Sequence, residues 1–401
     1  MLSKLLFLIT YILYISSIFM IGQIKVPGLP INFNILLTLI LFIFCIKIER
    51  KLYTDKLLKY YWLFIAFYGL SALLTNYFTD FFHFLYSSVL MAYVAYWSTL
   101  IIARNYKIEL ILPNIIVIIG VFDAIVTTSQ ALGLHFYING LVDVVSMNKE
   151  LLDTLADSDY NMGVALSGIY YSPVMNGRYL LFFFLTSFLL FKNRLNSLYI
   201  FLSLIILIGI FYCQQRSAFF LSILSLIIII LNYNSKSKFL KYMFIGSVII
   251  SIIILIPKFL EYIDNSGSRL TENSGTGREN IWPIALDFIL SNPLFAGNRL
   301  FMNTFNTTPH NLFLSAFIAG GVIGGTMLSI LVIRLTLKSI KIICDKHKNY
   351  DLLVISLIIL SLIGDSMFHN FGFVQADLPM FIGLALYNIF IENKKTFDNI
   401  S

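Results

Sequence analysis

The sequence predicts an all-α polytopic membrane protein with about 12 transmembrane helices in a single integral membrane domain, residues 1–401. Hydrophobic residues make up 58% and charged residues 12% of the chain, against about 25% charged residues in a soluble domain. The mean hydropathy is +0.84, and apolar windows of about 18–20 residues recur along the chain. This composition excludes a water-soluble core, and nothing in the chain supports nucleic-acid binding.

The apolar windows place candidate spans from the first residues to near the C-terminus. Residues 1–20 resemble a signal peptide, with Lys4 before an apolar run, but no small-x-small cleavage site follows, so we expect an uncleaved first span. The expected spans are residues 5–21, 31–48, 60–74, 82–103, 110–130, 179–191, 198–212, 218–231, 239–256, 311–335, 352–367 and 379–391.

Lysine and arginine are distributed unequally between alternate loops, which sets the expected orientation. They concentrate near both termini and in loops such as 47–59 and 334–348, and this bias marks the cytoplasmic side. Both termini are therefore expected in the cytoplasm. The two long loops, about residues 131–178 and 257–310, then lie on the outer face, where the first is acidic and the second carries arginines.

The three cysteines do not form a recognisable site. Cys45, Cys213 and Cys344 fall far apart, on different spans or sides, so neither a disulfide framework nor a CxxC metal site is expected. The outer loops also lack an Asp-rich or His-rich metal spacing. We therefore expect a site that uses no metal and no cofactor.

The second outer loop contains a short predicted helix at residues 281–291. Asn280 is the expected N-cap, because Pro283 then lies in the first turn, where proline is tolerated, and Asn292 with Pro293 ends the helix. At about 1.5 Å per residue this helix cannot cross a bilayer of about 30 Å. Its largely apolar surface suits a helix that lies in the membrane interface.

Three arginines stand at the outer ends of spans or segments, where the positive-inside bias makes arginine unusual. Arg178 lies in a turn that begins a span, Arg216 in a tight turn between two spans, and Arg278 at the start of the short helix. Guanidinium groups pair bidentately with phosphate oxygens, so convergence of the three would form a clamp for a diphosphate. The alternative for each is an interfacial or solvated arginine at the lipid headgroups.

His310 and Asn311 lie where the second outer loop meets the next predicted span. An imidazole with the ordinary histidine pKa of about 6.5 takes a proton from a sugar hydroxyl at neutral pH, which indicates a general base. The alternative is a histidine that caps or anchors a helix end. Asn311 is expected to orient the loop or a substrate hydroxyl.

Small residues follow this pair, and other ionisable residues lie near predicted span ends. The glycines form small-xxx-small pairs, typical of close helix packing: Gly320, Gly321, Gly324 and Gly325. Asp365 and His369 form a weaker candidate cluster, and His83 and Asp123 are weaker still.

The motifs of the second outer loop together resemble a known family. In order they are Gly277-Arg278, Trp282, Asn292-Pro293, His310-Asn311, Gly321 and Gly324. This series is similar to the signature of the O-antigen ligase and O-antigen polymerase superfamily, with the His-Asn stretch as its most specific part and about residues 160–340 covered by motifs. One departure is that Leu294, Phe295 and Ala296 precede Gly297, where the family usually has glycines closely after Asn-Pro.

This resemblance implies a membrane glycosyltransferase at the periplasmic face of the cytoplasmic (inner) membrane. The implied donor is a glycan on undecaprenyl diphosphate, and the other implied partners are an acceptor glycan and membrane lipid. The implied site has His310 as general base, diphosphate-binding Arg178, Arg216 and Arg278, and supporting Asn311, Trp282, Gly321 and Gly324. Attack opposite the diphosphate would invert the anomeric centre.

Three functions remain open at this stage. A polymerase would transfer the glycan to another lipid-linked repeat unit, and a ligase would transfer it to the lipid A core. Two sizeable outer loops favour the polymerase, for which a chain-length regulator is an open partner. The alternative from another class is a flippase for the same lipid-linked sugar, but a flippase is expected to carry charges along a central path within its spans.

Overall fold

The computed structural model describes residues 2–20, 33–49, 58–74, 81, 85–105, 108–132, 166, 168–170, 173–194, 197–213, 215–232, 246, 278–294, 297–345, 349–369 and 371–398. The predicted span at 239–256, apart from Gly246, lies outside these residues, as do most of the first outer loop and the second outer loop before Arg278.

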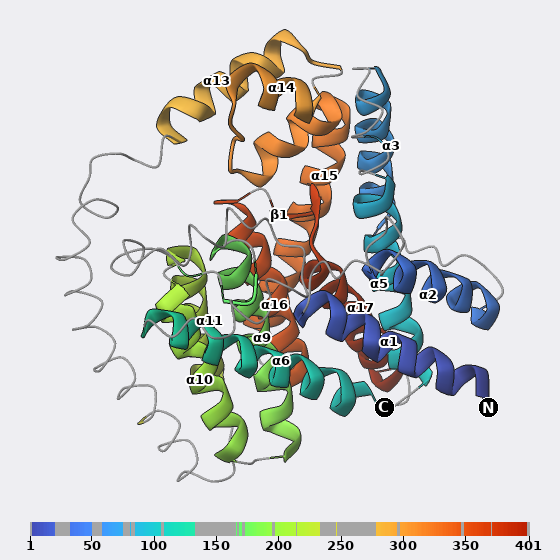
Figure 1. Ribbon diagram of the computed structural model, residues 1–401, viewed down its shortest axis with the longest axis vertical. Coiled ribbons are helices and arrows are strands. Elements are labelled where there is room, and N and C mark those ends of the chain that lie inside the picture. Colours follow the sequence, from blue (N-terminus) through green and yellow to red (C-terminus); the bar gives the residue numbers. More distant parts are fainter. Residues whose placement is uncertain are drawn as a thin grey trace. The chain divides into compact units, whose positions relative to one another are not determined.

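The described chain is almost entirely helical, and each of the other predicted spans coincides with a helical segment (Figure 1). The helices are α1 (Leu2–Met20), α2 (Phe33–Glu49), α3 (Lys59–Leu74), the π-helix η1 (Leu85–Met91), α5 (Ala92–Asn105), α6 (Ile108–Ala131), α9 (Pro173–Arg194), α10 (Ser197–Cys213), α11 (Arg216–Asn232), α13 (Arg278–Ser291), α14 (Asn298–Phe305), α15 (Leu312–Cys344), α16 (Tyr350–Ser366) and α17 (Leu378–Asp398). Two short parallel strands, β1 (Phe371–Gly372) and β2 (Gln375–Ala376), join α16 to α17.

Among the described residues, three helical segments are long and apolar enough to cross a membrane. They are Ile111–Ala131, Val174–Phe191 and Leu312–Cys344. Other apolar helices are shorter, such as those at Leu198–Cys213 and Arg216–Asn232. The helical membrane class is confirmed in this coarse form, whereas the number of 12 spans stays a prediction.

The helices form two compact units. The first unit comprises residues 1–40, 106–273 and 349–361, and the second comprises residues 41–105, 274–348 and 362–401. The expected single membrane domain over residues 1–401 stays a prediction.

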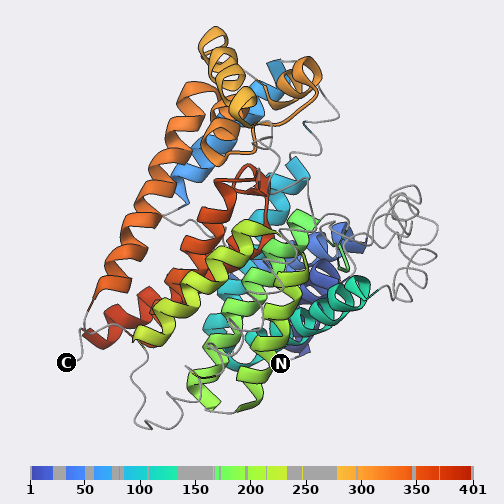
Figure 2. The same ribbon diagram turned by 90° about the vertical axis from the view of Figure 1, so that its left-hand side faces the viewer.

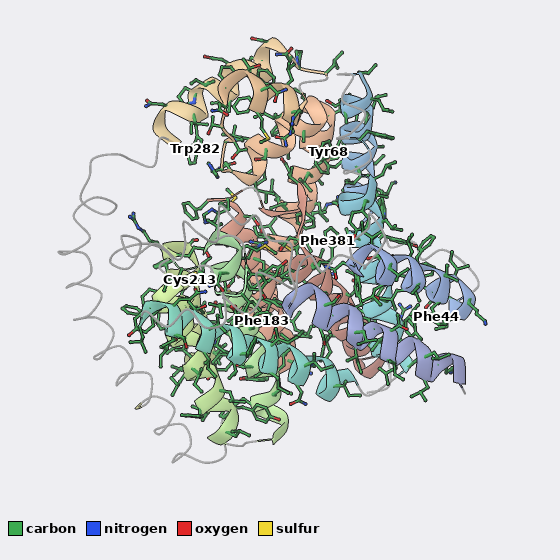
Figure 3. The ribbon with its side chains drawn as sticks, viewed as in Figure 1. Phe44, Tyr68, Phe183, Cys213, Trp282 and Phe381 are labelled. Atoms are coloured by element: carbon green, nitrogen blue, oxygen red, sulfur yellow. The ribbon has the colours of Figure 1, made fainter. Side chains whose placement is uncertain are left out.

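The core of the first unit is a set of close helix contacts among α6, α9, α10 and α11. Figure 2 shows α9, α10 and α11 side by side, and α6 packs against both α9 and α10. Small residues permit this approach: a Cβ on Gly209 of α10 would come within 2.7 Å of the Ala124 backbone, and a Cβ on Gly120 would overlap Phe183. Phe183, labelled in Figure 3, is fully buried in this core.

The second unit is organised around the long helix α15. α3 runs along α15, α5 packs on α17, and α13 and α14 lie over the first part of α15 (Figure 1). The α13–α14 pair has its own small core, in which Ala285, Ile289 and Phe301 pack on Ile318 of α15. The loop carrying His310 therefore follows a packed helical cap.

Two features of this cap differ from the sequence predictions. The expected helix 281–291 begins earlier, at Arg278, so Pro283 lies inside α13 and not in its first turn. The absence of an N–H at Pro283 removes only one backbone bond, to the carbonyl of Glu279, and packing of α13 on α15 compensates for it. The helix α14 was not predicted from the sequence.

Candidate functional site

The backbone at His310 is held in an unusual conformation. His310 has φ 47°, in the left-handed region that residues other than glycine rarely adopt, although asparagine, aspartate and histidine do so more often than the rest. Its Nε2 lies 3.2 Å from the Thr308 hydroxyl oxygen, and the side chain is half-buried. Strain of this kind is maintained only when the surrounding structure fixes it, which is typical of functional sites.

Asn311 fixes the C-terminal side of this loop. It is the N-cap of α15, and its Oδ1 accepts hydrogen bonds from the N–H groups of Phe313 and Leu314 at 3.0 and 3.2 Å. These bonds satisfy two of the amides that a helix start leaves unpaired. Its Nδ2 donates to the Met367 carbonyl at 3.4 Å. Asn311 therefore orients the loop through helix capping, and binding of a substrate hydroxyl stays a prediction.

Trp282 fixes the N-terminal side of the same loop. The side chain, labelled in Figure 3 near the start of α13, donates from Nε1 to the Pro309 carbonyl at 2.9 Å. Pro309 directly precedes His310, so the helix α13 and the N-cap of α15 hold His310 from both sides. The structure thus joins three of the predicted site residues, Trp282, His310 and Asn311.

Replacing Trp282 with phenylalanine should loosen this loop while leaving α13 in place. Loss of one hydrogen bond to a backbone carbonyl is expected to reduce stability by about 1 kcal/mol. We expect the glycan transfer that the resemblance implies to be a few-fold slower, measured with purified protein. The matched control is Ser291→Ala, because Ser291 is exposed on the same helix and its hydroxyl bonds to the Asp287 carbonyl of that helix. Equal rates for Trp282→Phe and wild type would show that the bond to Pro309 does not position His310.

Gly321 interrupts the helix α15, and the helix-packing role predicted for it from the sequence is wrong. Its φ of 64° and ψ of −173° lie in a region that is essentially restricted to glycine, so it is a kink and not a helix-packing position. A helix without the kink would pair the Val322 N–H with the Ile318 carbonyl. Instead, the Val322 N–H donates to the Pro293 carbonyl at 2.8 Å, and the Ile318 carbonyl accepts from the Gly297 N–H at 2.8 Å.

The turn that follows α13 is therefore hydrogen-bonded to the opened turn of α15 at Gly321. Both backbone groups released by the kink are paired with this segment, which satisfies the requirement that buried backbone groups be hydrogen-bonded. A Cβ on Gly321 would overlap the Leu294 carbonyl oxygen, so the close approach requires glycine. The Asn-Pro turn, the kink and the His310 loop form one connected structure.

The neighbouring glycines have the packing role that was predicted. A Cβ on Gly324 would lie 3.0 Å from Phe67 Cβ, and a Cβ on Gly320 would lie 3.2 Å from the Phe64 ring. Both phenylalanines belong to α3, which runs along α15. Gly324 thus supports the site by allowing α3 to approach.

Asp365 and His369, the weaker candidate cluster, flank a residue that bonds to the N-cap of α15. His369 Nε2 is 3.9 Å from Asp365 Oδ1, and the Asp365 side chain is fully buried. Met367, between them in sequence, accepts the hydrogen bond from Asn311. The end of α16 therefore forms part of the surroundings of this loop.

Two of the predicted arginines, Arg178 and Arg216, directly follow residues that are in contact with each other in the first unit. Arg216 is the first residue of α11, only three positions after the end of α10 at Cys213, which confirms the predicted tight turn. A Cβ on Gly177 of α9 would overlap Gln215, so the residues that precede Arg178 and Arg216 are in contact. Both arginines therefore stand where the start of α9 meets the α10–α11 turn.

The environments of these arginines differ. Arg178 is fully buried, whereas Arg216 is exposed at its helix start. A phosphate is favoured at such a start, where backbone N–H groups point outward. Arg278 begins α13 and belongs to the second unit, and its side chain lies outside what the structure describes. Its convergence with the other two stays a prediction.

Asp123, a weak candidate in the sequence, belongs to a buried polar face of α6 that was not predicted. Asp123, Thr127 and Gln130 occur at i, i+4 and i+7, and all three are buried. This spacing places them on one face of a helix, which is a readable signal in an otherwise apolar segment. The described residues contain no group of three or more His, Cys, Asp or Glu side chains arranged to hold a metal ion.

Comparison with known protein families gives a match for the segment that contains Arg216 and the His310 loop. Residues 201–329 match the family model described as O-Antigen ligase. The match covers about a third of the chain and shows that this part is similar to the O-antigen ligase family. It includes Arg216, Arg278, Trp282, His310 and the kink of α15, and it confirms the resemblance to the ligase and polymerase superfamily. No curated protein matches the chain significantly.

The O-antigen ligase family indicates a membrane glycosyltransferase of the ligase or polymerase type, with a lipid-linked glycan and an acceptor as substrates. The match begins within α10, so Arg178 and the polar face of α6 lie outside it.

Proposed function

We propose that the protein is a polymerase of O-antigen or a related surface polysaccharide. It would transfer an undecaprenyl-diphosphate-linked glycan to another lipid-linked repeat unit at the periplasmic face of the inner membrane, with both termini in the cytoplasm. The observation that carries this proposal is the His310 loop, fixed between Trp282 and the N-cap Asn311 within the segment that matches the O-antigen ligase family.

In this proposal His310 is the general base. Its imidazole accepts the proton of the acceptor hydroxyl while the hydroxyl oxygen attacks the anomeric carbon of the donor. Such assistance contributes about 10²–10⁴-fold to a rate. The left-handed backbone and the Thr308 contact restrict the orientation of the imidazole, and this restriction reduces the entropy lost on reaching the reactive geometry.

Arg178 and Arg216 would hold the diphosphate, with Arg278 as a third cation. As the bond between the anomeric carbon and the diphosphate oxygen breaks, its electron pair moves to that oxygen, and fixed guanidinium groups stabilise the developing charge. This arrangement supplies the positive charge from the chain itself, so we propose a metal-independent reaction. Attack from the opposite face inverts the anomeric centre.

The apolar stripe of α13 supports binding of this site to the membrane interface. Its inner face buries Ala285 and Ile289, whereas Leu286 and Leu290 are 51% and 76% exposed, and Leu294, in the turn that follows α13, is 58% exposed. Exposed leucines on a helix too short to span a bilayer suit the acyl boundary, where a lipid carrier presents its diphosphate.

The polymerase is tested by the surface polysaccharide ladder of a deletion strain. A polymerase predicts a single repeat unit on the lipid A core in the deletion strain, and return of the full ladder with the wild-type gene. Rough core with polymer still on the lipid carrier would establish the ligase instead. Lipid-linked repeat units retained on the cytoplasmic side would indicate the flippase.

A further inference from the structure

The first unit contains a buried polar network that contacts the start of α9. Asp123, Thr127 and Gln130 line one face of α6 and are 0%, 0% and 4% exposed. Placing a carboxyl, a hydroxyl and an amide in an apolar helix is unfavourable unless each is hydrogen-bonded. Their partners therefore indicate what the network holds.

Two of these side chains, Gln130 and Asp123, hydrogen-bond to the short turn at Gly168 and Ile169. Gln130 Nε2 donates to the Gly168 carbonyl at 2.8 Å, and Gln130 Oε1 accepts from the Gly168 N–H at 3.0 Å. Asp123 Oδ1 accepts from the Ile169 N–H at 3.1 Å. Gly168 has φ 58°, and a Cβ there would lie 2.6 Å from Thr127 Oγ1 and overlap Asp123. The turn is thus fixed in position and has no space for a larger residue.

The network then continues into α9. Asn176 Nδ2 donates to Thr127 Oγ1 at 3.0 Å and to the Leu166 carbonyl at 3.0 Å. Asn176 is fully buried, and the next residue in α9, Gly177, contacts Gln215. A continuous set of contacts therefore runs from α6 to the positions that precede Arg178 and Arg216.

Two acceptors in this network are left open, which bears on its role. Among the described residues, Asp123 Oδ2 and Asn176 Oδ1 are buried and have no hydrogen-bond partner. Such open acceptors lower stability, because their desolvation is not compensated. We therefore infer that this polar network does more than stabilise the fold: it fixes the direction in which α9 begins.

We propose that Asp123, Gln130 and Asn176 are positioning residues for the arginine pair Arg178 and Arg216. This inference rests on the proposed diphosphate binding by that pair. The three side chains do not contact the ligand in this proposal. They hold the first turn of α9 against the α10–α11 turn, so that the two guanidinium groups are arranged before the ligand binds, which favours affinity.

The test is binding of undecaprenyl diphosphate to the purified full-length protein in detergent, with the dissociation constant and the fraction of binding molecules determined separately. Gln130→Met keeps the volume but removes the contacts to Gly168, and Asp123→Ala removes the acceptor for Ile169. Both should weaken binding tenfold or more. Asp123→Asn keeps that acceptor and should restore binding to within about fivefold of wild type.

The matched control is Ser129→Ala, because the Ser129 hydroxyl bonds to the Ile125 carbonyl of its own helix and to none of the other described residues. It should bind as wild type does. If Asp123→Ala fails to fold, Gln130→Met and Gln130→Glu decide the question. A smaller fraction of binding molecules with an unchanged dissociation constant would show a purely structural role and would overturn the inference.

Arg178→Gln separates this inference from the proposed function. If Arg178→Gln loses binding while Gln130→Met keeps the wild-type dissociation constant, the arginine clamp stands and the positioning role is wrong. If wild type and Arg178→Gln have the same dissociation constant, the clamp is wrong and the positioning role is wrong with it.

Discussion

Replacing His310 with alanine should slow glycan transfer by about 10²–10⁴-fold, the usual contribution of a general base. The acceptor hydroxyl would then lose its proton only to water, while the arginines would still bind the diphosphate. Binding of undecaprenyl diphosphate should therefore remain within a few-fold of wild type. The measurement is the rate of polymer formation from purified lipid-linked repeat units, together with that binding constant.

The left-handed backbone at His310 provides a matched control. Alanine at φ 47° adds backbone strain of about 1 kcal/mol or more, so His310→Ala combines a chemical with a structural change. Asparagine tolerates this region, as Asn306 does at φ 49° at the end of α14. His310→Asn should therefore lose as much activity with a smaller loss of thermal stability. A transfer rate near that of wild type in His310→Asn would show that His310 is not the general base.

Replacing Gly321 with alanine should have the largest effect on stability of any single methyl group in the site. The kink strain of about 1–3 kcal/mol adds to overpacking of about 1–3 kcal/mol, since the new Cβ would overlap the Leu294 carbonyl oxygen. Relief of the overlap requires the turn after α13 to move, which breaks the Val322–Pro293 and Gly297–Ile318 bonds. We expect a free energy of unfolding lower by about 3 kcal/mol or more.

The control for this prediction is the adjacent Gly320→Ala. Its Cβ would meet the Phe64 ring at 3.2 Å and the Gly325 nitrogen at 3.6 Å, which is ordinary van der Waals contact, and a side chain can move by a few tenths of an ångström more easily than a backbone carbonyl. Thermal unfolding of both variants in detergent compares them directly, and the transfer rate should follow stability because the kink supports the His310 loop. Equal unfolding temperatures for the two variants would contradict the proposed role of the kink.

Several local features could be predicted because they depend on neighbouring residues. The tight turn before Arg216, the short helix carrying Trp282 and the position of His310 ahead of a long helix all follow from apolar runs interrupted by polar residues. The start of α13 at Arg278 could not be predicted, because Pro283 argues against it locally and packing on α15 decides it. The helix α14 likewise depends on Phe301, which packs in a core shared with α13 and α15.

The sequence by itself determined the helical membrane class, most of the helical segments that the structure describes, with α14 as an exception, and the family-like motif around His310. Only the tertiary structure decided that Gly321 is a kink, that Trp282 holds Pro309, and that a polar face of α6 holds the start of α9. The physical reason is that hydrophobic periodicity reports how much of each segment is buried. A backbone group such as the Val322 N–H instead finds its partner, the Pro293 carbonyl, in a segment 29 positions earlier in the chain, and only folding brings the two together.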